Sequence, residues 1–314
     1  MWMTLLLSGL LTLVELNCEN LFDCYHDEGK QDAEYTPGGL RRWTRTRFWQ
    51  KVNNLAQEIA SCSSYEGGNN LPDVVALCEV ENDSCMLYLT QRSLLRGAGY
   101  EYVMTNSADP RGIDVALLYQ SDAFRPLCYD VLRPTTPPGQ RPTRDILYVK
   151  GLTRSLDTLH VFVCHFPSRY GNRHQRDEFR REIAEMMVHS LDSLLQRNAH
   201  SLIAVLGDFN ETCSEPSPSL LRHYSQQCVT DTCLGRHGAL GSYCYQGLWQ
   251  HIDHIFISLA LQPLVVHARV NDAPFLLQED ERYLGLKPFR TFYGSHYQSG
   301  GYSDHLPLVV TLRL

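Results

Sequence analysis

Short apolar runs, each four to seven residues long and bounded by turn residues, recur along this chain and constrain its fold more than any other feature. Runs of this length are typical of buried strands and are too short to cross a membrane as helices. The predicted strands are 11–16, 73–78, 113–119, 146–149, 160–164, 202–206, 252–257 and 308–312.

Three segments between these runs have helical spacing instead. Apolar residues line one face after Thr46, over 48–59, and another face over 179–194. The third segment, 83–96, is closed by Gly97, and glycine is common directly after the end of a helix. Because strands outnumber helices and the helices fall between strands, the pattern predicts layered α/β packing with sheets in the core and helices outside.

The composition is that of a globular protein and excludes a disordered chain. Of 314 residues, 43% are hydrophobic, which is enough to build a sizeable core. The proline-rich segment 133–142 and the segment 214–219 are predicted to be surface loops. Neither segment is long enough to divide the chain, so we expect one domain over residues 1–314.

The N-terminus allows two interpretations. Its first 16 residues are mostly apolar but lack a basic n-region and an A-x-A cleavage site, and they are short for a membrane span. We favour a first strand, preceded by residues 1–10 as a possible leader remnant; the alternative is a cleaved signal peptide. The compartment stays open: cytoplasmic, or periplasmic or secreted if the leader is real. We expect no stable insertion into a membrane.

The charge balance argues against a protein that coats nucleic acid. The net charge is −7, whereas such proteins are normally strongly basic. Arginine nevertheless outnumbers lysine by 24 to 4, and its planar fork suits phosphate; codon bias explains the same ratio. The 11 cysteines are odd in number, which leaves at least one thiol free, and a chain of this length does not need a disulfide framework. No CxxC pair occurs, and no Cys/His spacing resembles a closed zinc site.

Polar residues collect where the predicted strands end. Asn17, Glu79, His165 and Asp208 each follow an apolar run within a few positions, and further polar clusters flank the runs 252–257 and 308–312. Strand ends that meet at one edge of a sheet are rigid supports for a catalytic site. We therefore expect these side chains to converge.

Each of these residues has a chemistry of its own. Glu79 at the mouth of an apolar strand needs a partner or a cation, and Asn17 offers a neutral oxygen to the same Mg²⁺ or Mn²⁺. Asp208 and Asn210, two apart on a turn, are placed to hold a water. Taken singly, any of them is more simply a turn or capping residue; their joint occurrence favours a site.

A carboxylate and an imidazole form a second element of this site. Asp253 and His305 are predicted to pair, the carboxylate fixing the imidazole tautomer and favouring the protonated ring. The imidazolium would then stabilise negative charge on phosphate, and His165 would add a second donor.

A family resemblance rests on seven motifs: LNCENLFD (16–23), ALCEVEN (76–82), RGIDVALLY (111–119), VCHFPSR (163–169), LGDFNE (206–211), HIDHIFIS (251–258) and SDHLPLVV (303–310). In this order they resemble the endonuclease/exonuclease/phosphatase superfamily, which includes pancreatic-type deoxyribonucleases and inositol polyphosphate 5-phosphatases. The resemblance implies a four-layered α/β sandwich, with two central, mostly antiparallel sheets flanked by helices. The segment 19–23 is closer to bacterial branches than to the shorter turn of many nucleases.

The resemblance also implies roles for individual residues. Glu79 becomes the main metal ligand, helped by Asn17 and Asp304. Asp208 orients or deprotonates the attacking water, and both Asp208 and His305 remain candidates for the base. The other implied phosphate or water contacts are Asn210, the His305–Asp253 pair and His165.

Two arginine clusters surround these motifs. The first surrounds Trp43, and the second follows His165: Arg41, Arg42, Arg45 and Arg47, then Arg169, Arg173, Arg176, Arg180 and Arg181. The functional interpretation is contact with phosphate or nucleic acid, with Trp43 free to stack on a base. The alternative is a solvated helix face with carboxylate partners. Arg169 and Arg111 are the arginines we expect on the substrate phosphate.

Three functions are compatible with these residues. The favoured one is a Mg²⁺- or Mn²⁺-dependent phosphodiesterase, in particular a nuclease, and the alternative is a phosphomonoesterase acting on a phosphorylated small molecule or a lipid headgroup. The third, a non-enzymatic scaffold, is disfavoured because no expected catalytic position is lost. A nuclease needs a long positive trough and a phosphomonoesterase a closed pocket. A monomer is the expected state.

Overall fold

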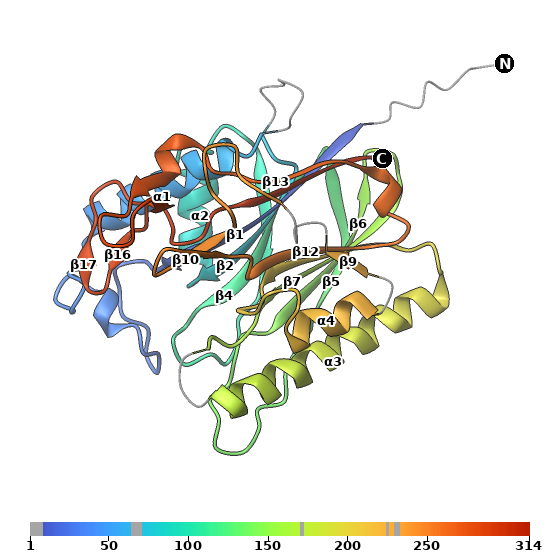
Figure 1. Cartoon of the computed structure of the whole chain (residues 1–314), viewed down its shortest axis with the longest axis horizontal. Helices are drawn as coiled ribbons and strands as arrows, with labels where there is room; N and C mark the ends of the chain where they lie inside the picture. The colour runs from blue at the N-terminus through green and yellow to red at the C-terminus, as the bar shows by residue number, and fades with distance from the viewer. Residues whose placement is uncertain (1–8, 64–70, 170–172, 224–225, 229–232) are drawn as a thin grey trace.

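Two six-stranded sheets form the centre of the molecule (Figure 1). The computed structural model describes residues 9–63, 71–169, 173–223, 226–228 and 233–314. The first sheet has the order β13 (Val265–Val270), β18 (Leu308–Arg313), β1 (Leu10–Leu21), β2 (Val74–Val80), β4 (Asp114–Gln120) and β3 (Tyr100–Met104). The second has the order β5 (Phe124–Leu132), β6 (Ile146–Thr153), β7 (Thr158–His165), β8 (Leu202–Asp208), β12 (Asp253–Ser258) and β9 (Gln226–Cys228).

Most strand pairs are antiparallel. The parallel pairs among the described strands are β1 with β2 and β7 with β8. Three two-stranded ribbons complete the β structure: β10 (Tyr243–Tyr245) with β11 (Leu248–Gln250), β14 (Leu277–Glu279) with β15 (Leu286–Pro288), and β16 (Phe292–Tyr293) with β17 (His296–Tyr297). Three 3-10 helices are also present: η1 (Ala33–Tyr35), η2 (Gln262–Leu264) and η3 (Pro274–Leu276).

Helices cover the outer face of each sheet, which gives four layers. Helices α1 (Arg45–Ala60) and α2 (Asp83–Gln91) lie on the first sheet, whereas α3 (Arg173–Arg197) and α4 (Pro216–His223) lie on the second (Figure 1). Three hydrophobic clusters fill the three interfaces between these layers. The predicted four-layered α/β sandwich with two mostly antiparallel sheets is therefore confirmed.

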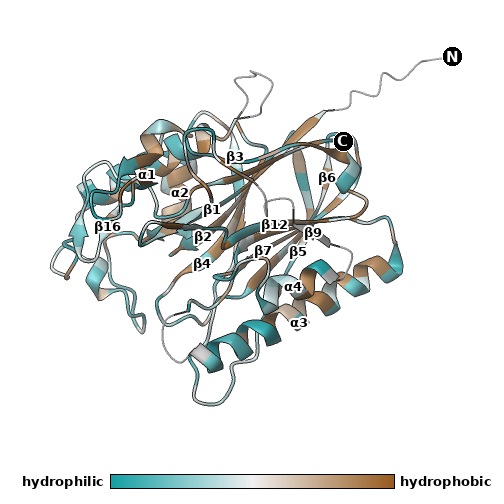
Figure 2. Cartoon of the chain, in the orientation of Figure 1, coloured by the Kyte–Doolittle hydropathy of each residue, from teal (hydrophilic) through white to brown (hydrophobic). Residues whose placement is uncertain are grey.

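Strands in the middle of this sandwich are buried on both faces. In β1, Leu11 and Leu13 pack between the sheets, while Val14 and Leu16 pack under α1 and α2. Figure 2 shows the result as hydrophobic strands enclosed by helices of mixed colour. Double-sided burial makes these strands read as continuous apolar runs without a two-residue period.

The first strand differs from its prediction. It does not end at residue 16 but continues to Leu21, because residues 17–20 form a bulge opposite β2. Glu19 and Asn20 have positive φ angles there, 48° and 58°. The polar residues after the apolar run are thus an irregularity inside a strand, and bulges of this kind re-aim side chains next to functional sites.

Three edge strands were not predicted from the sequence. β3, β5 and β13 lie at or beside the sheet edges and contain many exposed or half-exposed residues, so they lack a clear apolar run. Five of the nine residues of β5 are exposed.

Three helix boundaries also differ. Helix α1 begins at Arg45 rather than after Thr46, because Thr44 caps it by accepting the backbone N–H of Arg47. Helix α2 ends at Gln91, five residues before the predicted end, and the Ser93 hydroxyl donates to the Leu89 carbonyl there. The predicted loop 214–219 contains the start of α4, since proline is tolerated in a first helical turn.

The chain ends bear on two further predictions. Strands β1 and β18 lie near opposite ends of the chain and are hydrogen-bonded neighbours. That residues 1–314 form a single domain stays a prediction. The leader interpretation falls on residues 1–8, which lie outside the described residues, and on residues 9–10, where β1 begins. Within the described part of the chain, no helix combines the length and apolar character needed to span a bilayer.

Candidate active site

Three neighbouring strands of the second sheet bring His165, Asp208 and Asp253 into one row. His165 ends β7 opposite Asp208 at the end of β8, and Asp208 lies opposite Asp253 at the start of β12. Two positions further into the strands, Val163, Leu206 and Ile255 belong to the core between the sheets. Because side chains two apart share a face, the three polar residues also face the gap between the sheets.

The imidazole of His305 lies against the carboxylate of Asp253. Nδ1 of His305 is 2.8 Å from Oδ2 and 3.0 Å from Oδ1 of Asp253, and the Ser242 hydroxyl donates to the same carboxylate at 2.6 Å. The Tyr243 ring lies 4.9 Å from the imidazole, centroid to centroid. Burial alone would lower the pKa of His305, but the carboxylates of Asp253 and Asp304 outweigh it and raise this pKa well above its ordinary value.

Two amide groups hold the carboxylate of Asp208. The backbone N–H of Asn210 donates to its Oδ1 at 2.8 Å, and the Asn17 side chain donates to its Oδ2 at 3.0 Å. Asn210 has a positive φ of 53°, and its side chain donates to the Phe166 carbonyl. Burial and the neighbouring Asp253 raise the pKa of Asp208. The predicted Asp208–Asn210 turn therefore exists, with the Asn210 backbone rather than its side chain on the carboxylate.

Glu79 reaches the same gap from the first sheet. Its φ of 63° accompanies a register shift at the end of β2, so the backbone bulge turns the carboxylate toward the site. Oε2 of Glu79 accepts the Asn20 N–H at 2.9 Å. Its Oε1 lies 3.8 Å from Nε2 of His165 and 3.9 Å from Nη1 of Arg111.

His165 occupies the space between the two carboxylates. Its Nε2 is 3.6 Å from Asp208 Oδ2, and its Nδ1 has no hydrogen-bond partner among the described residues. Burial and the nearby guanidiniums of Arg144 and Arg111 lower the pKa of His165 well below its ordinary value. The ring is consequently a neutral donor between Glu79 and Asp208 at neutral pH.

The carboxylate of Asp304 forms an ion pair with the guanidinium of Arg290. Its Oδ2 accepts from Arg290 at 2.9 Å, while its Oδ1 lies 3.9 Å from Nε2 of His305. Arg290 also donates to Glu19, whose buried carboxylate accepts the backbone N–H groups of residues 291 and 292. The bulge in β1 therefore anchors Arg290 beside the site.

The donor set fits a hard divalent cation. Carboxylate oxygens of Glu79, Asp208 and Asp304 and the amide oxygen of Asn17 are the ligand types that Mg²⁺ or Mn²⁺ prefers. Buried carboxylates crowd here, and one oxygen of Glu15 has no hydrogen-bond partner among the described residues. Glu79, with Asn17 and Asp304, would hold the ion; the Asn17 oxygen also accepts the Glu19 N–H.

A second grouping of possible ligand atoms overlaps this site. Atoms of Asp208, Asp253 and His305 lie within 4.8 Å of one another. The hydrogen bond to Asp253 occupies Nδ1 of His305, however, and the raised pKa of this imidazole favours its protonated form, so this trio is better suited to moving protons than to holding metal.

The two arginines predicted to contact the substrate phosphate, Arg111 and Arg169, lie in different surroundings. Arg111 is 41% exposed at the mouth of the site, within reach of a substrate phosphate. Arg169 instead donates to the Asn210 carbonyl and to Glu215, each at 2.6 Å, so it supports the turn after Asp208 and does not contact the carboxylate cluster.

Two other features expected to touch nucleic acid are structural. Trp43 is fully buried, donates to the Phe22 carbonyl at 2.8 Å and packs against Phe292, so it offers no face to a base. Arg180 is buried in an ion pair with Glu211. Trp43 is buried against aromatic residues such as Phe292, and Arg180 is buried between α3 and the turn after β8; spacing alone does not show either.

Several residues of the site were missed from the sequence. Arg290, Ser242 and Tyr243 belong to none of the quoted motifs, and Glu19, although it lies in the first motif, had no role assigned to it; its partner Arg290 is 271 positions away. For Glu19 a signal was present, since a charged residue directly after an apolar run is costly to bury without partners.

Comparison with known proteins gives a consistent result. Residues 12–314 match the model of the Endonuclease/Exonuclease/phosphatase family. No curated protein sequence matches the chain.

Solved structures share the fold. An endonuclease/exonuclease/phosphatase family protein from Bacteroides thetaiotaomicron has a TM-score of 0.63 at 17% identity, covering 97% of this chain and 95% of that one. A mannosyl-6-phosphatase from the same organism has a TM-score of 0.62 at 17% identity, covering 96% and 98%. D. rerio TDP2 complexed with a single-strand DNA product has 0.57 at 14%, covering 98% and 100%. At these identities the likeness extends to the fold alone.

Proposed function

The chain belongs to the endonuclease/exonuclease/phosphatase family, whose members hydrolyse phosphate esters, and from this membership we propose that it is a divalent-metal-dependent phosphomonoesterase acting on a small phosphorylated molecule. The observation that carries the proposal is the convergence of Asp208, the His305–Asp253 pair and Glu79 at one end of the gap between the sheets.

We assign the base to Asp208. Its carboxylate is held by two amide donors and has no cationic side chain hydrogen-bonded to it among the described residues, so it can accept a proton from a water. As that proton leaves, the water oxygen forms a bond to phosphorus and the bond from phosphorus to the leaving oxygen breaks. His305 is less suited to this role because Asp253 favours its protonated ring.

His305 and His165 stabilise charge on the phosphoryl group. The Nδ1 atom of His305 is engaged by Asp253, which leaves Nε2 to donate to a phosphoryl oxygen. His165 is a neutral donor between Glu79 and Asp208, and Arg111 approaches from the mouth. A divalent cation held by Glu79, Asn17 and Asp304 would neutralise charge on the phosphate and on the leaving oxygen.

Two observations favour a small substrate over a nucleic acid. Three arginines of the second cluster have carboxylate partners: Arg169 with Glu215, Arg180 with Glu211 and Arg181 with Glu185. Trp43 is not available for base stacking. The likeness to a mannosyl-6-phosphatase adds support for a phosphomonoester.

A phosphodiesterase acting on nucleic acid is the second candidate. Arg42 before helix α1 and Arg45 at its start are exposed, and the fold is shared with TDP2, which was crystallised with a DNA product. A substrate panel with Mg²⁺ or Mn²⁺ separates the two candidates. It should contain hexose phosphates, inositol phosphates, single- and double-stranded DNA, RNA and a chromogenic phosphodiester. We expect phosphate release from small monoesters; cleavage confined to DNA or RNA would overturn the proposal.

A further inference from the structure

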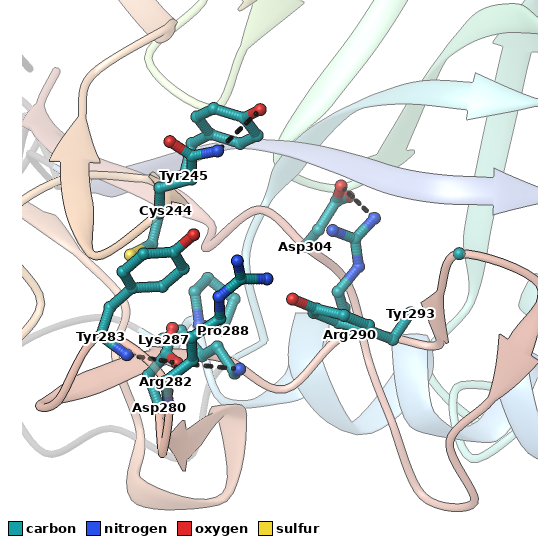
Figure 3. Close-up of a pocket in the computed structure, with 12 residues that line it drawn as sticks. Cys244, Tyr245, Asp280, Arg282, Tyr283, Lys287, Pro288, Arg290, Tyr293 and Asp304 are labelled. Atoms are coloured by element: carbon teal, nitrogen blue, oxygen red, sulfur yellow. Dashed lines mark hydrogen bonds and ion pairs between the residues drawn. The ribbon is translucent and has the colours of Figure 1, made fainter.

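A cavity of about 280 Å³ opens directly beside the catalytic residues. Figure 3 shows it between Cys244 and Tyr245 of β10, Tyr283 and Lys287 of the β14–β15 ribbon, and the segment that carries Arg290 and Asp304. Asp304 belongs both to this cavity and to the active site, where it lies 3.9 Å from His305. Ligand pockets for drug-sized molecules occupy about 300–1,000 Å³, so this one has room for a single ring.

Strand β10 links the cavity to the catalytic imidazole. Tyr243 at its start packs on His305 and forms a β-bridge with it. The next residues, Cys244, Tyr245 and Gln246, line the cavity. A molecule bound here therefore lies next to the position of the reacting phosphate, which is where the leaving alcohol of a phosphomonoester must be.

The lining combines aromatic faces with donors and acceptors. Tyr245, Tyr283 and Tyr293 come from three different segments, and all three are at least 37% exposed. No ring contact joins any two of them within the described residues. Arg282 covers one face of Tyr283 and Lys287 one face of Tyr293, which leaves the opposite faces for a ligand. A nucleobase slot would instead present two roughly parallel rings.

The polar groups suit hydroxyls better than a second phosphate. Asp280 and Gln246 supply acceptors, while Arg282 and Lys287 supply donors. Lys287 lies 3.4 Å from Asp280 and over the Tyr293 ring. The two carboxylates of the lining, Asp280 and Asp304, are paired with Lys287 and Arg290, so the charges nearly balance within the cavity. A ring with several hydroxyls can use both the donors and the acceptors of these pairs.

The walls of the cavity are braced against each other. Asp280 accepts the backbone N–H groups of Arg282 and Tyr283, which shapes the turn between β14 and β15. Gly247, with a φ of +78°, lies in the β10–β11 turn, where an added Cβ would be 2.7 Å from Cβ of Tyr283. The two ribbons therefore fix Tyr283 at the cavity without help from a ligand.

We propose that this cavity binds the hydroxylated ring of a phosphorylated monosaccharide or cyclitol, with tyrosine faces against the ring carbons and with Asp280, Gln246, Arg282 and Lys287 on its hydroxyls. The proposal rests on the proposed phosphomonoesterase function for its link to catalysis. It adds the substrate class and the residues that select it.

Binding of the free ring tests this assignment separately from catalysis. The full chain is titrated with glucose, mannose, myo-inositol and adenosine, and binding is followed by saturation-transfer NMR. We expect at least one of the three hydroxylated rings to bind more tightly than adenosine. Tyr283→Ala should weaken that binding at least tenfold, whereas Tyr129→Ala, which removes an exposed tyrosine of β5, should leave it unchanged.

The outcomes separate the two proposals. Binding of adenosine alone, or of no hydroxylated ring, would overturn the assignment of the cavity even if the chain proves to be a phosphatase. Ring binding that depends on Tyr283 supports it even if no phosphatase activity is found, and in that case only the proposed function fails. Gln246→Ala serves as the second variant if thermal melting shows that Tyr283→Ala does not fold.

Discussion

His305 Nδ1 lies 2.8 Å from Asp253 Oδ2, and this contact joins the loop before the last strand of the first sheet to the first residue of a strand in the second sheet. Both residues are buried. The pair therefore fixes one imidazole tautomer and leaves Nε2 free to act on substrate.

Replacing Asp253 tests the importance of that pair. Asp253→Asn keeps the size of the side chain but removes the charge that favours the protonated ring, so kcat should fall by about 10²-fold or more. Ser242→Ala removes only the second hydrogen bond of the carboxylate and should cost less. Steady-state kinetics on the best monoester checks both variants, and equal losses would contradict the assigned order.

Glu79 is predicted to set the affinity for the metal. Glu79→Gln removes a hard anionic ligand, so the Mg²⁺ concentration that gives half-maximal activity should rise at least tenfold. Glu101→Gln, which alters an exposed carboxylate on the outer strand β3, is the matched control and should leave that concentration unchanged. Activity that survives exhaustive chelation would contradict the metal assignment altogether.

Glu58 gives a prediction about stability. This residue of α1 is fully buried, and neither of its carboxylate oxygens has a hydrogen-bond partner among the described residues. Burial raises its pKa to about 8, although Lys51 opposes the shift. The folded state therefore holds a proton that the unfolded state loses near pH 4, and the free energy of unfolding decreases as pH rises from about 4 to 8.

Glu58→Gln should remove that part of the pH dependence. The loss amounts to at most about 1.4 kcal/mol per pH unit, and comparison with the unmodified chain cancels the other titrating groups. Urea unfolding of both proteins at pH 5 and pH 8 measures it. From pH 5 to pH 8, we expect the free energy of unfolding of the variant to increase relative to that of the unmodified chain. If the difference in free energy between the two proteins is the same at both pH values, Glu58 does not titrate in this range.

Much of the site was predictable because its residues stand directly beside buried strands. Asp208 and Asp253 flank long apolar runs, and the register of β8 and β12 makes them neighbours. Arg290 could not be predicted in this way, since it pairs with Glu19, 271 positions away, from a segment of small ribbons. The bulges at Glu19 and Glu79 depend on strand pairing, which local sequence does not encode.

The same distinction explains the arginines and Trp43. The composition shows an excess of arginine, but which carboxylate each arginine pairs with depends on the tertiary structure. Arg180 is buried by packing between α3 and the turn after β8, where Glu211 receives it. The spacing of residues in the sequence could not show which arginines and aromatic side chains are exposed. Their burial and pairing changed the favoured substrate from nucleic acid to a small molecule.

The most direct test of the site is the rate of phosphate ester hydrolysis after loss of its two central groups. Asp208→Ala and His305→Ala should each lower kcat with saturating Mg²⁺ by about 10²–10⁴-fold. Asp130→Ala, an exposed aspartate on β5, should leave kcat unchanged. A rate within twofold of the unmodified chain for either Asp208→Ala or His305→Ala would contradict the placement of the catalytic site between the two sheets.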